Sequence, residues 1–321
     1  MKHSSLTTHH SLLITYILLI LSTGFWGISF VMTNELLEVP HMSVPILIAL
    51  RLAIATAVML PVLALARKLE RVRKQDIKWF LLLALCEPFV YYLCETNGIN
   101  QVGSTMASVI IATIPLFVPF GMWIGYRTRI KPAMILGVVL SLVGIILLTL
   151  SSSEEKFQLS ISNFQFKGIL FLSGAVFIAV VYTLILVKIV DHYRPVTITV
   201  YQNIIGLVYF LPLAFYSAST DNFHLSPLTF HLKDLLYLLI LGICCSTLAY
   251  VFYNRGVRHL GASEACIFNN AIPVVTFFVA LSLPGLAHPE TFSWLKLLYI
   301  AIVISGVVIA QYEPSINKRS S

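Results

Sequence analysis

Polar side chains with binding chemistry interrupt several long apolar stretches of this sequence. The guanidinium of Arg51 could bind a carboxylate or a similar anionic group, and the carboxylate of Glu87 could bind an amine or carry a proton. The stretch CIFNNAIPVV adds two adjacent side-chain amides, those of Asn269 and Asn270. At the centre of a membrane span a charged side chain of this kind costs about 2.5 to 3.5 kcal/mol, so we expect each one to face a protein interior.

We predict a substrate-binding site built from these residues together with aromatic and amide side chains at similar depth. Its members are Trp26, Arg51, Glu87, Tyr92, Gln202, Tyr250, Asn269 and Asn270. Glu87, which precedes the helix-breaking Pro88, is also the candidate proton carrier for coupling. Two alternatives stay open. Arg51 could form a structural ion pair with Glu87 or Glu95, and the two asparagines could only bond neighbouring helices.

Pro115 and Pro273 are predicted helix breaks. Because proline has no amide hydrogen, the carbonyl four residues earlier, that of Ile111 or Asn269, loses its helical partner. In lipid such a carbonyl must find another donor or face a polar cavity. Tyr91 and Tyr253 are expected to anchor the chain at the membrane interface.

The rest of the sequence indicates an integral membrane protein. Of its 321 residues, 58% are hydrophobic and only 11% are charged, and the mean hydropathy is +0.88. A soluble domain of this length cannot be so apolar. Since each crossing needs about 20 apolar residues, about ten crossings fit. The predicted spans cover residues 12–36, 44–66, 77–97, 103–125, 133–150, 167–188, 195–217, 234–254, 261–282 and 293–311.

Lys and Arg residues are distributed unequally between the two sides of this predicted topology. One side holds 16 of the 21, the other holds 4, and Arg51 lies inside a span. By the positive-inside rule both termini are cytoplasmic, as expected for a multi-pass protein of the cytoplasmic membrane. The net charge of +7 lies in short connectors, which gives no sign of nucleic-acid binding.

The two halves of the sequence repeat each other. LSTGFWG at Leu21 matches LSGAVFI at Leu172, and the segment ending at Pro115 matches the segment ending at Pro273 at an offset of 158 residues. Because each half holds five crossings, the second must run antiparallel to the first. We therefore predict an all-α integral membrane fold of ten transmembrane helices arranged as two inverted five-helix repeats. Its parts are a cytoplasmic N-terminus (1–11), the first repeat (12–150), an external linker (151–166), the second repeat (167–312) and a cytoplasmic tail (313–321).

With these features the sequence resembles the EamA-type transporters of the drug/metabolite transporter superfamily. The resemblance rests on the two repeats, FWGISF in the first span, the basic connector before the third, and G-x-x-x-A ahead of Ile-Pro in spans four and nine. It implies that spans one to four and six to nine line a central cavity. It also implies export and peripheral fifth and tenth spans, in which Gly137 with Ser141 and Ala301 with Ser305 would allow close packing.

The sequence thus predicts a secondary transporter that moves small organic metabolites, such as amino acids or similar amphipathic solutes, by alternating access. The alternatives are a proton-coupled uptake system, a metabolite exchanger or a channel. An enzyme is not expected, because the nine histidines lie in termini, connectors or span ends and no HExxH, GxSxG or P-loop motif occurs. No cofactor or metal is expected. The expected partners are a small-molecule substrate and the lipid bilayer, with a homodimer left open and no nucleic acid.

Overall fold

The computed structural model describes residues 2–67, 69–127, 132–151, 163–220, 231–283, 285–286 and 292–311, and the regular secondary structure in these ranges is helical throughout. Eight helical segments are long and apolar enough to cross a membrane. They cover Leu12–Leu37, Val44–Leu65, Lys74–Val102, Ser104–Tyr126, Gln165–Ile189, Pro195–Thr220, Leu232–Leu260 and Ala262–Ser282. The prediction of an all-α integral membrane protein is confirmed at this level. Most of the predicted linker and the predicted tail at 313–321 lie outside the described residues.

The helices of the described residues fall into two halves of the chain. In the first half they are α1 (Lys2–Leu37), α2 (Val44–Leu65), η1 (Lys74–Asp76), α3 (Ile77–Ala84), η2 (Leu85–Val90), α4 (Tyr91–Val102), α5 (Ser104–Ile111), α6 (Ile114–Tyr126) and α7 (Pro132–Ser151). In the second half they are α8 (Asn163–Ile189), α9 (Pro195–Thr220), α10 (Leu232–Ile240), η3 (Leu241–Leu248), α11 (Ala249–Leu260), α12 (Ala262–Cys266), η4 (Ile267–Ala271), α13 (Ile272–Ser282) and α14 (Trp294–Gln311).

Prolines mark where several helices begin. Pro45, Pro115 and Pro273 lie in the first turns of α2, α6 and α13. In a first turn the missing amide hydrogen has no helical acceptor to lose, and the fixed φ suits the helix. Pro115 and Pro273 therefore divide two membrane segments into a short helix and a longer one, α5 with α6 and α12 with α13.

Two other membrane segments contain a turn of π-helix in the middle. In Lys74–Val102 this turn is η2, and in Leu232–Leu260 it is η3. Each segment ends at a glycine with positive φ, Gly103 at 80° and Gly261 at 93°. Glycine adopts this conformation without the steric penalty of a side chain, and so permits the tight turn into α5 or α12. A π-turn inside a helix shifts which residues face a given neighbour, and such turns are frequent at functional sites.

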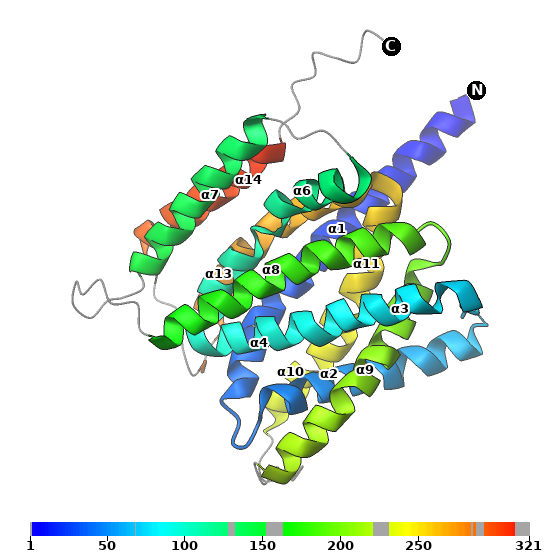
Figure 1. The fold of residues 1–321 in the computed structure, drawn as a ribbon, viewed down its shortest axis with the longest axis horizontal. Coiled ribbons are helices and arrows are strands. Elements are labelled where there is room, and N and C mark those ends of the chain that lie inside the picture. The colour runs from blue at the N-terminus through cyan, green and yellow to red at the C-terminus, as the bar shows by residue number, and fades with distance from the viewer. Residues whose placement is uncertain are drawn as a thin grey trace.

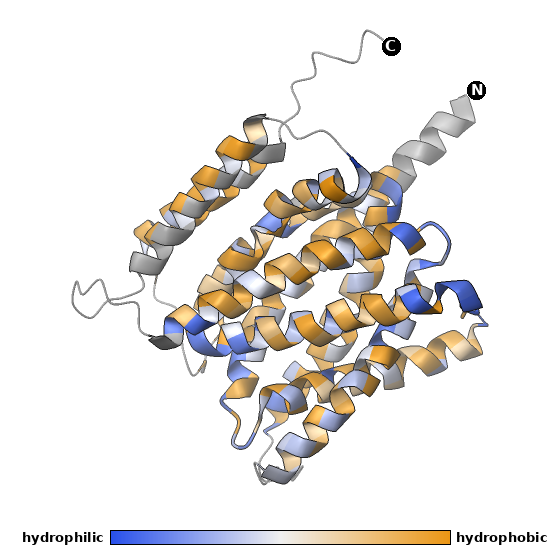
Figure 2. Ribbon diagram, viewed as in Figure 1, coloured by the Kyte–Doolittle hydropathy of each residue, from blue (hydrophilic) through white to orange (hydrophobic). Residues whose placement is uncertain are grey.

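The helices form a bundle with a separate pair at one side (Figure 1). Within the bundle, α4 packs along α8, α1 along α11, and α2 along α9. These contacts bring the first half of the chain against the second. The outer surface carries large exposed apolar side chains, such as Ile124, Phe177 and Phe215, which suit contact with lipid. Figure 2 shows the matching pattern, with hydrophobic residues along the helices and hydrophilic ones concentrated near helix ends and connections.

The pair at the side consists of α7 and α14. The Ser141 hydroxyl donates a hydrogen bond to the main-chain oxygen of Val303 at 2.9 Å, and a Cβ atom added to Gly306 would lie 2.7 Å from the main-chain oxygen of Gly137. The peripheral placement and the packing at Gly137 and Ser141 agree with the sequence. The prediction for α14 was wrong, because Ala301 and Ser305 are exposed and the helix contacts α7 through Val303 and Gly306.

Candidate functional site

A cavity with a volume of about 50 Å³ lies inside the bundle. Both halves of the chain contribute to its wall. The lining residues are Trp26, Ser29, Phe30, Arg51, Glu87, Tyr91, Tyr92, Glu95, Ile111, Ile114, Ala179, Tyr182, Thr183, Tyr250, Tyr253, Asn269 and Ile272. Six of the eight predicted binding residues are among them, and the other two, Gln202 and Asn270, are not.

Glu87 enters the cavity from the π-turn η2, where the helix is interrupted. Its backbone is extended, with φ −145° and ψ 118°, as is favoured for a residue that precedes a proline. The side chain is only 7% exposed, and its carboxylate accepts a hydrogen bond from the hydroxyl of Tyr250 on α11. The break in the helix thus places a buried carboxylate where the second half of the chain supplies its donor.

Arg51 projects from α2 and is 3% exposed. Its Nε donates a hydrogen bond to the Ser246 hydroxyl, and its guanidinium carbon lies 4.3 Å from the centre of the Tyr92 ring. The described part of the chain contains no ion pair between Arg51 and a carboxylate; two ion pairs that it does contain join Lys233 to Glu35 and Arg194 to Glu70. The alternative of a structural bridge from Arg51 to Glu87 or Glu95 is therefore wrong. A hydroxyl and an aromatic face hold the guanidinium instead.

Glu95 is a second buried carboxylate in the same cavity, and sequence reasoning considered it only as a bridge to Arg51. It is 7% exposed and accepts a hydrogen bond of 2.9 Å from the Tyr91 hydroxyl. Tyr91 and Glu95 are four residues apart on α4, the spacing at which helical side chains meet. That spacing was the available signal, and it would have identified Glu95 together with its donor.

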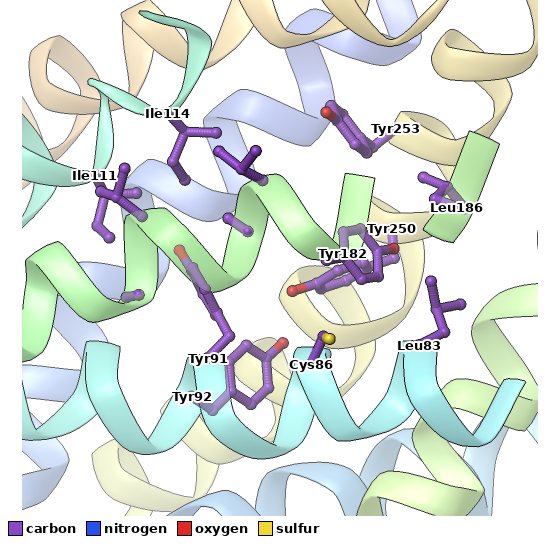
Figure 3. Close-up of a cluster of buried hydrophobic side chains, with 14 of the residues drawn as sticks. Leu83, Cys86, Tyr91, Tyr92, Ile111, Ile114, Tyr182, Leu186, Tyr250 and Tyr253 are labelled. Carbon is purple, nitrogen blue, oxygen red and sulfur yellow. The ribbon is translucent and has the colours of Figure 1, made fainter. Parts of the chain in front are cut away.

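Aromatic rings cover much of the remaining wall. The Trp26 ring centre lies 5.3 Å from that of Tyr250 and 5.2 Å from that of Tyr253. Figure 3 shows Tyr91 and Tyr92 on α4, Tyr182 on α8, and Tyr250 and Tyr253 on α11 converging on one region. The expectation that Tyr91 and Tyr253 are interfacial anchors was wrong, because they are only 6% and 5% exposed and both line the cavity.

Gln202 lies behind the cavity wall rather than in it. It is fully packed within α9, and its side-chain oxygen accepts a hydrogen bond of 3.4 Å from the Tyr182 hydroxyl. Tyr182 itself lines the cavity. Gln202 is therefore placed to orient this tyrosine.

The two asparagines differ in their positions. Asn269 lines the cavity, whereas Asn270 does not. Among the described residues, the side-chain oxygen of Asn269 and both polar side-chain atoms of Asn270 are buried without a hydrogen-bond partner. The alternative that both amides bond neighbouring helices is therefore not what the structure shows. The main-chain oxygen of Asn269 is also not left free as predicted, because the 3₁₀ turn η4 lets it accept the amide hydrogen of Ile272.

Comparison with known proteins identifies the family of this chain. The model of the EamA-like transporter family matches residues 13–150 and 166–312. The chain belongs to the EamA-like transporter family. An uncharacterized transporter of Archaeoglobus fulgidus is 27% identical over 90% of this chain and 98% of that protein. The uncharacterized transporter YetK of Bacillus subtilis is 23% identical over 81% of this chain and 76% of that protein.

The fold of this EamA-like transporter is also similar to a solved one. A protein crystal structure with 16% sequence identity matches with a TM-score of 0.60, over 90% of this chain and 97% of that chain. At this identity the likeness concerns the fold alone. The membership confirms the sequence resemblance and makes the chain a membrane transporter.

The cavity of this EamA-like transporter combines ionisable, hydrogen-bonding and aromatic side chains. Two carboxylates, one guanidinium, several tyrosine hydroxyls and an amide share one aromatic-lined space. Among the described residues, no group of three or more His, Cys, Asp or Glu side chains could hold a metal ion. The cavity offers charge of both signs and aromatic faces to an organic solute.

Proposed function

We propose that this EamA-like transporter is a secondary transporter of small organic metabolites, with amino acids or similar amphipathic solutes as the substrate class. The observation that carries the proposal is the buried cavity, in which Arg51 can bind an anionic group and Glu87 an amine. Charges buried at membrane depth are costly, and in transporters they mark the solute path. The aromatic rings around them suit the apolar part of an organic solute.

We also propose that the chain forms ten spans in two inverted five-helix repeats that rock about this cavity. Paired features support the duplication: the π-turns η2 and η3, the positive-φ residues Gly103 and Gly261, and the helix starts at Pro115 and Pro273. The two segments matched by the family model correspond to the proposed repeats. Inverted repeats with broken helices at the substrate site are typical of alternating access.

The proposed direction is export across a cytoplasmic membrane, with both termini in the cytoplasm. The distribution of Lys and Arg supports this orientation, and the direction follows from the family resemblance. A proton-coupled uptake system or a metabolite exchanger is the second candidate, favoured by the buried carboxylate of Glu87 at the helix break. A homodimer is compatible with either.

A ligand screen followed by vesicle transport tests the proposal. The purified protein would be heated with a panel of metabolites, because a solute that binds the native state raises its apparent stability. Solutes that raise the melting temperature would then be assayed for flux in proteoliposomes. Slow, saturable flux is expected for a transporter, currents of single channels would indicate a channel, and the absence of flux for every binding solute would refute transport.

The role of Glu87 in coupling has its own test. Glu87→Gln keeps the size of the side chain but removes the titratable group, so we expect both the transport rate and its dependence on pH to change. An unchanged rate and an unchanged pH dependence would remove Glu87 from the coupling mechanism.

The role of Arg51 is tested in the same way. Arg51→Gln should selectively weaken the binding of anionic or zwitterionic solutes. An equal loss of affinity for all solutes would argue against a binding role.

A further inference from the structure

The cavity contains three ionisable groups of full charge, Arg51, Glu87 and Glu95, and each is held by a neutral partner. Arg51 donates to the Ser246 hydroxyl, while Glu87 and Glu95 accept from the hydroxyls of Tyr250 and Tyr91. No ion pair joins these three groups within the described chain. In their ionised forms the three side chains have formal charges that sum to −1. Buried charges are stabilised by opposite charges and additional hydrogen bonds, and a solute of net positive charge would supply both.

Within the described chain, the cavity wall also contains hydrogen-bond acceptors that lack donors. Each carboxylate has two oxygens that can accept about four hydrogen bonds in total. In the structure each carboxylate accepts one hydrogen bond from a tyrosine hydroxyl. The side-chain oxygen of Asn269 is a further buried acceptor without a partner among the described residues. Arg51 provides the concentrated positive donor. The cavity thus has acceptors for two ammonium groups and a cationic donor for one carboxylate.

We propose that the substrate is an amino acid with a cationic side chain, such as L-lysine, and that Glu95 is the specificity-determining residue that binds its second amine. The inference rests on the proposed transport function and narrows it. A solute with one carboxylate and two amino groups has a net charge of +1, which neutralises the cavity. Its carboxylate pairs with Arg51, and its two amines pair separately with Glu87 and Glu95.

The positions of the two carboxylates suit one extended ligand. Glu87 and Glu95 are eight residues apart along η2 and α4, which corresponds to roughly 12 Å along a helix axis. The two carboxylates thus start from different levels of the cavity wall, and an extended ligand can place one amine at each level. The faces of Trp26 and Tyr253 lie within the wall and can cover methylene groups, and aromatic faces also attract ammonium groups.

Three probes on the unmodified protein test the charge pattern. L-lysine carries both amines and the carboxylate, L-norleucine lacks the second amine, and cadaverine lacks the carboxylate. Dissociation constants would be measured calorimetrically in lipid nanodiscs. We expect L-lysine to bind at least about tenfold more tightly than either analogue, the range for losing a hydrogen bond to a charged group. Equal or tighter binding of L-norleucine would overturn the inference.

Two variants test whether Glu95 is the carboxylate that binds the second amine. Glu95→Gln should bring the ratio of the L-lysine and L-norleucine affinities close to one. Glu264→Gln is the matched control, since Glu264 is exposed on α12 outside the cavity, and it should leave the ratio unchanged. If Glu95→Gln retains the full preference for L-lysine, Glu95 is not the second amine site. If that variant does not fold, the three probes on the unmodified protein still decide the substrate class.

Failure of this inference can be told apart from failure of the proposed function. Proteoliposomes that transport L-norleucine or another neutral solute as well as L-lysine would refute the cationic substrate and leave the transporter intact. Proteoliposomes that move no solute of the whole metabolite panel would refute the proposed transport itself.

Discussion

The segments Lys74–Val102 and Leu232–Leu260 share a backbone design but differ in chemistry. Each contains a π-turn and ends at a glycine with positive φ. At the repeat offset of 158 residues, Tyr92 corresponds to Tyr250, whereas Glu87 corresponds to Cys245 and Glu95 to Tyr253. The two carboxylates that line the cavity therefore both lie in the first segment, Lys74–Val102.

The segment Leu232–Leu260 nevertheless supplies hydrogen-bond partners for the charged residues of the cavity. Ser246 accepts the hydrogen bond of Arg51, and Tyr250 donates to Glu87. The repeated backbone thus provides two similar helix breaks, η2 and η3. The segment with η2 contributes charged side chains to the cavity, and the segment with η3 contributes hydroxyls that form hydrogen bonds with charged side chains. Because these contacts cross between the halves, neither half alone would complete the cavity.

The largest effect on transport is expected from removing the charge of Glu87 at the helix break η2. Glu87→Gln should lower the transport of a solute identified by the ligand screen by about tenfold to a hundredfold, because a hydrogen bond to a charged group is lost. The matched change in the other segment, Cys245→Ser, should leave transport near the unmodified rate, since Cys245 contacts the main-chain oxygen of Phe25 and does not line the cavity. Flux in proteoliposomes measures both. Equal losses would show that the two helix breaks contribute shape rather than charge.

The sequence predicted the apolar segments and the placement of many polar residues because lipid imposes strict rules on both. Long apolar runs must be helical, and Arg51 and Glu87 must avoid lipid. Which side of each helix faces the cavity could not be predicted from the sequence. The π-turn η2 changes the helical phase just before Tyr91 and Glu95, and η3 does so before Tyr253, so a regular helix gives the wrong faces for these residues. The same uncertainty in rotation placed Gln202 in the cavity instead of behind Tyr182.

The helix breaks η2 and η3 each pack closely against the other half of the chain, so an added methyl group at either contact should lower stability. A Cβ atom at Gly206 would meet the ring of Pro88 in η2, and one at Gly242 in η3 would lie 2.9 Å from the main-chain oxygen of Arg51. Neither neighbour can rotate away, so we expect Gly206→Ala and Gly242→Ala each to lower the free energy of unfolding by about 1–3 kcal/mol.

Gly24→Ala is the control for this pair. Among the described residues, no atom outside the helix's own backbone lies within 4 Å of a Cβ added there, so stability should stay the same or rise by up to about 1 kcal/mol from helix propensity. Thermal unfolding in detergent compares the three variants. A stable Gly206→Ala with an unstable Gly242→Ala would show that only one of the two breaks is rigid.

The neighbouring asparagines allow a finer comparison within one turn. Asn270→Leu removes two buried polar atoms that lack partners among the described residues, so it should raise stability, by about 1–3 kcal/mol, without changing ligand affinity. Asn269→Leu should weaken ligand binding, because Asn269 lines the cavity. Ligand titration and thermal unfolding of both variants separate the effects. Weaker binding in Asn270→Leu would place that residue in the binding site.

The smallest effect is expected at hydrogen bonds that join neighbouring helices of the two halves. The Thr276 hydroxyl donates to the main-chain oxygen of Gly27 at 2.9 Å between α13 and α1, and the Tyr126 hydroxyl donates to that of Leu184 at 3.0 Å between α6 and α8. Thr276 is completely buried whereas Tyr126 is exposed. Thr276→Val should therefore cost about 1 kcal/mol of unfolding free energy, and Tyr126→Phe clearly less, because water replaces only the exposed donor. Thermal unfolding would detect the difference, and the reverse order would mean that the α6–α8 contact, rather than the α1–α13 contact, holds the two halves together.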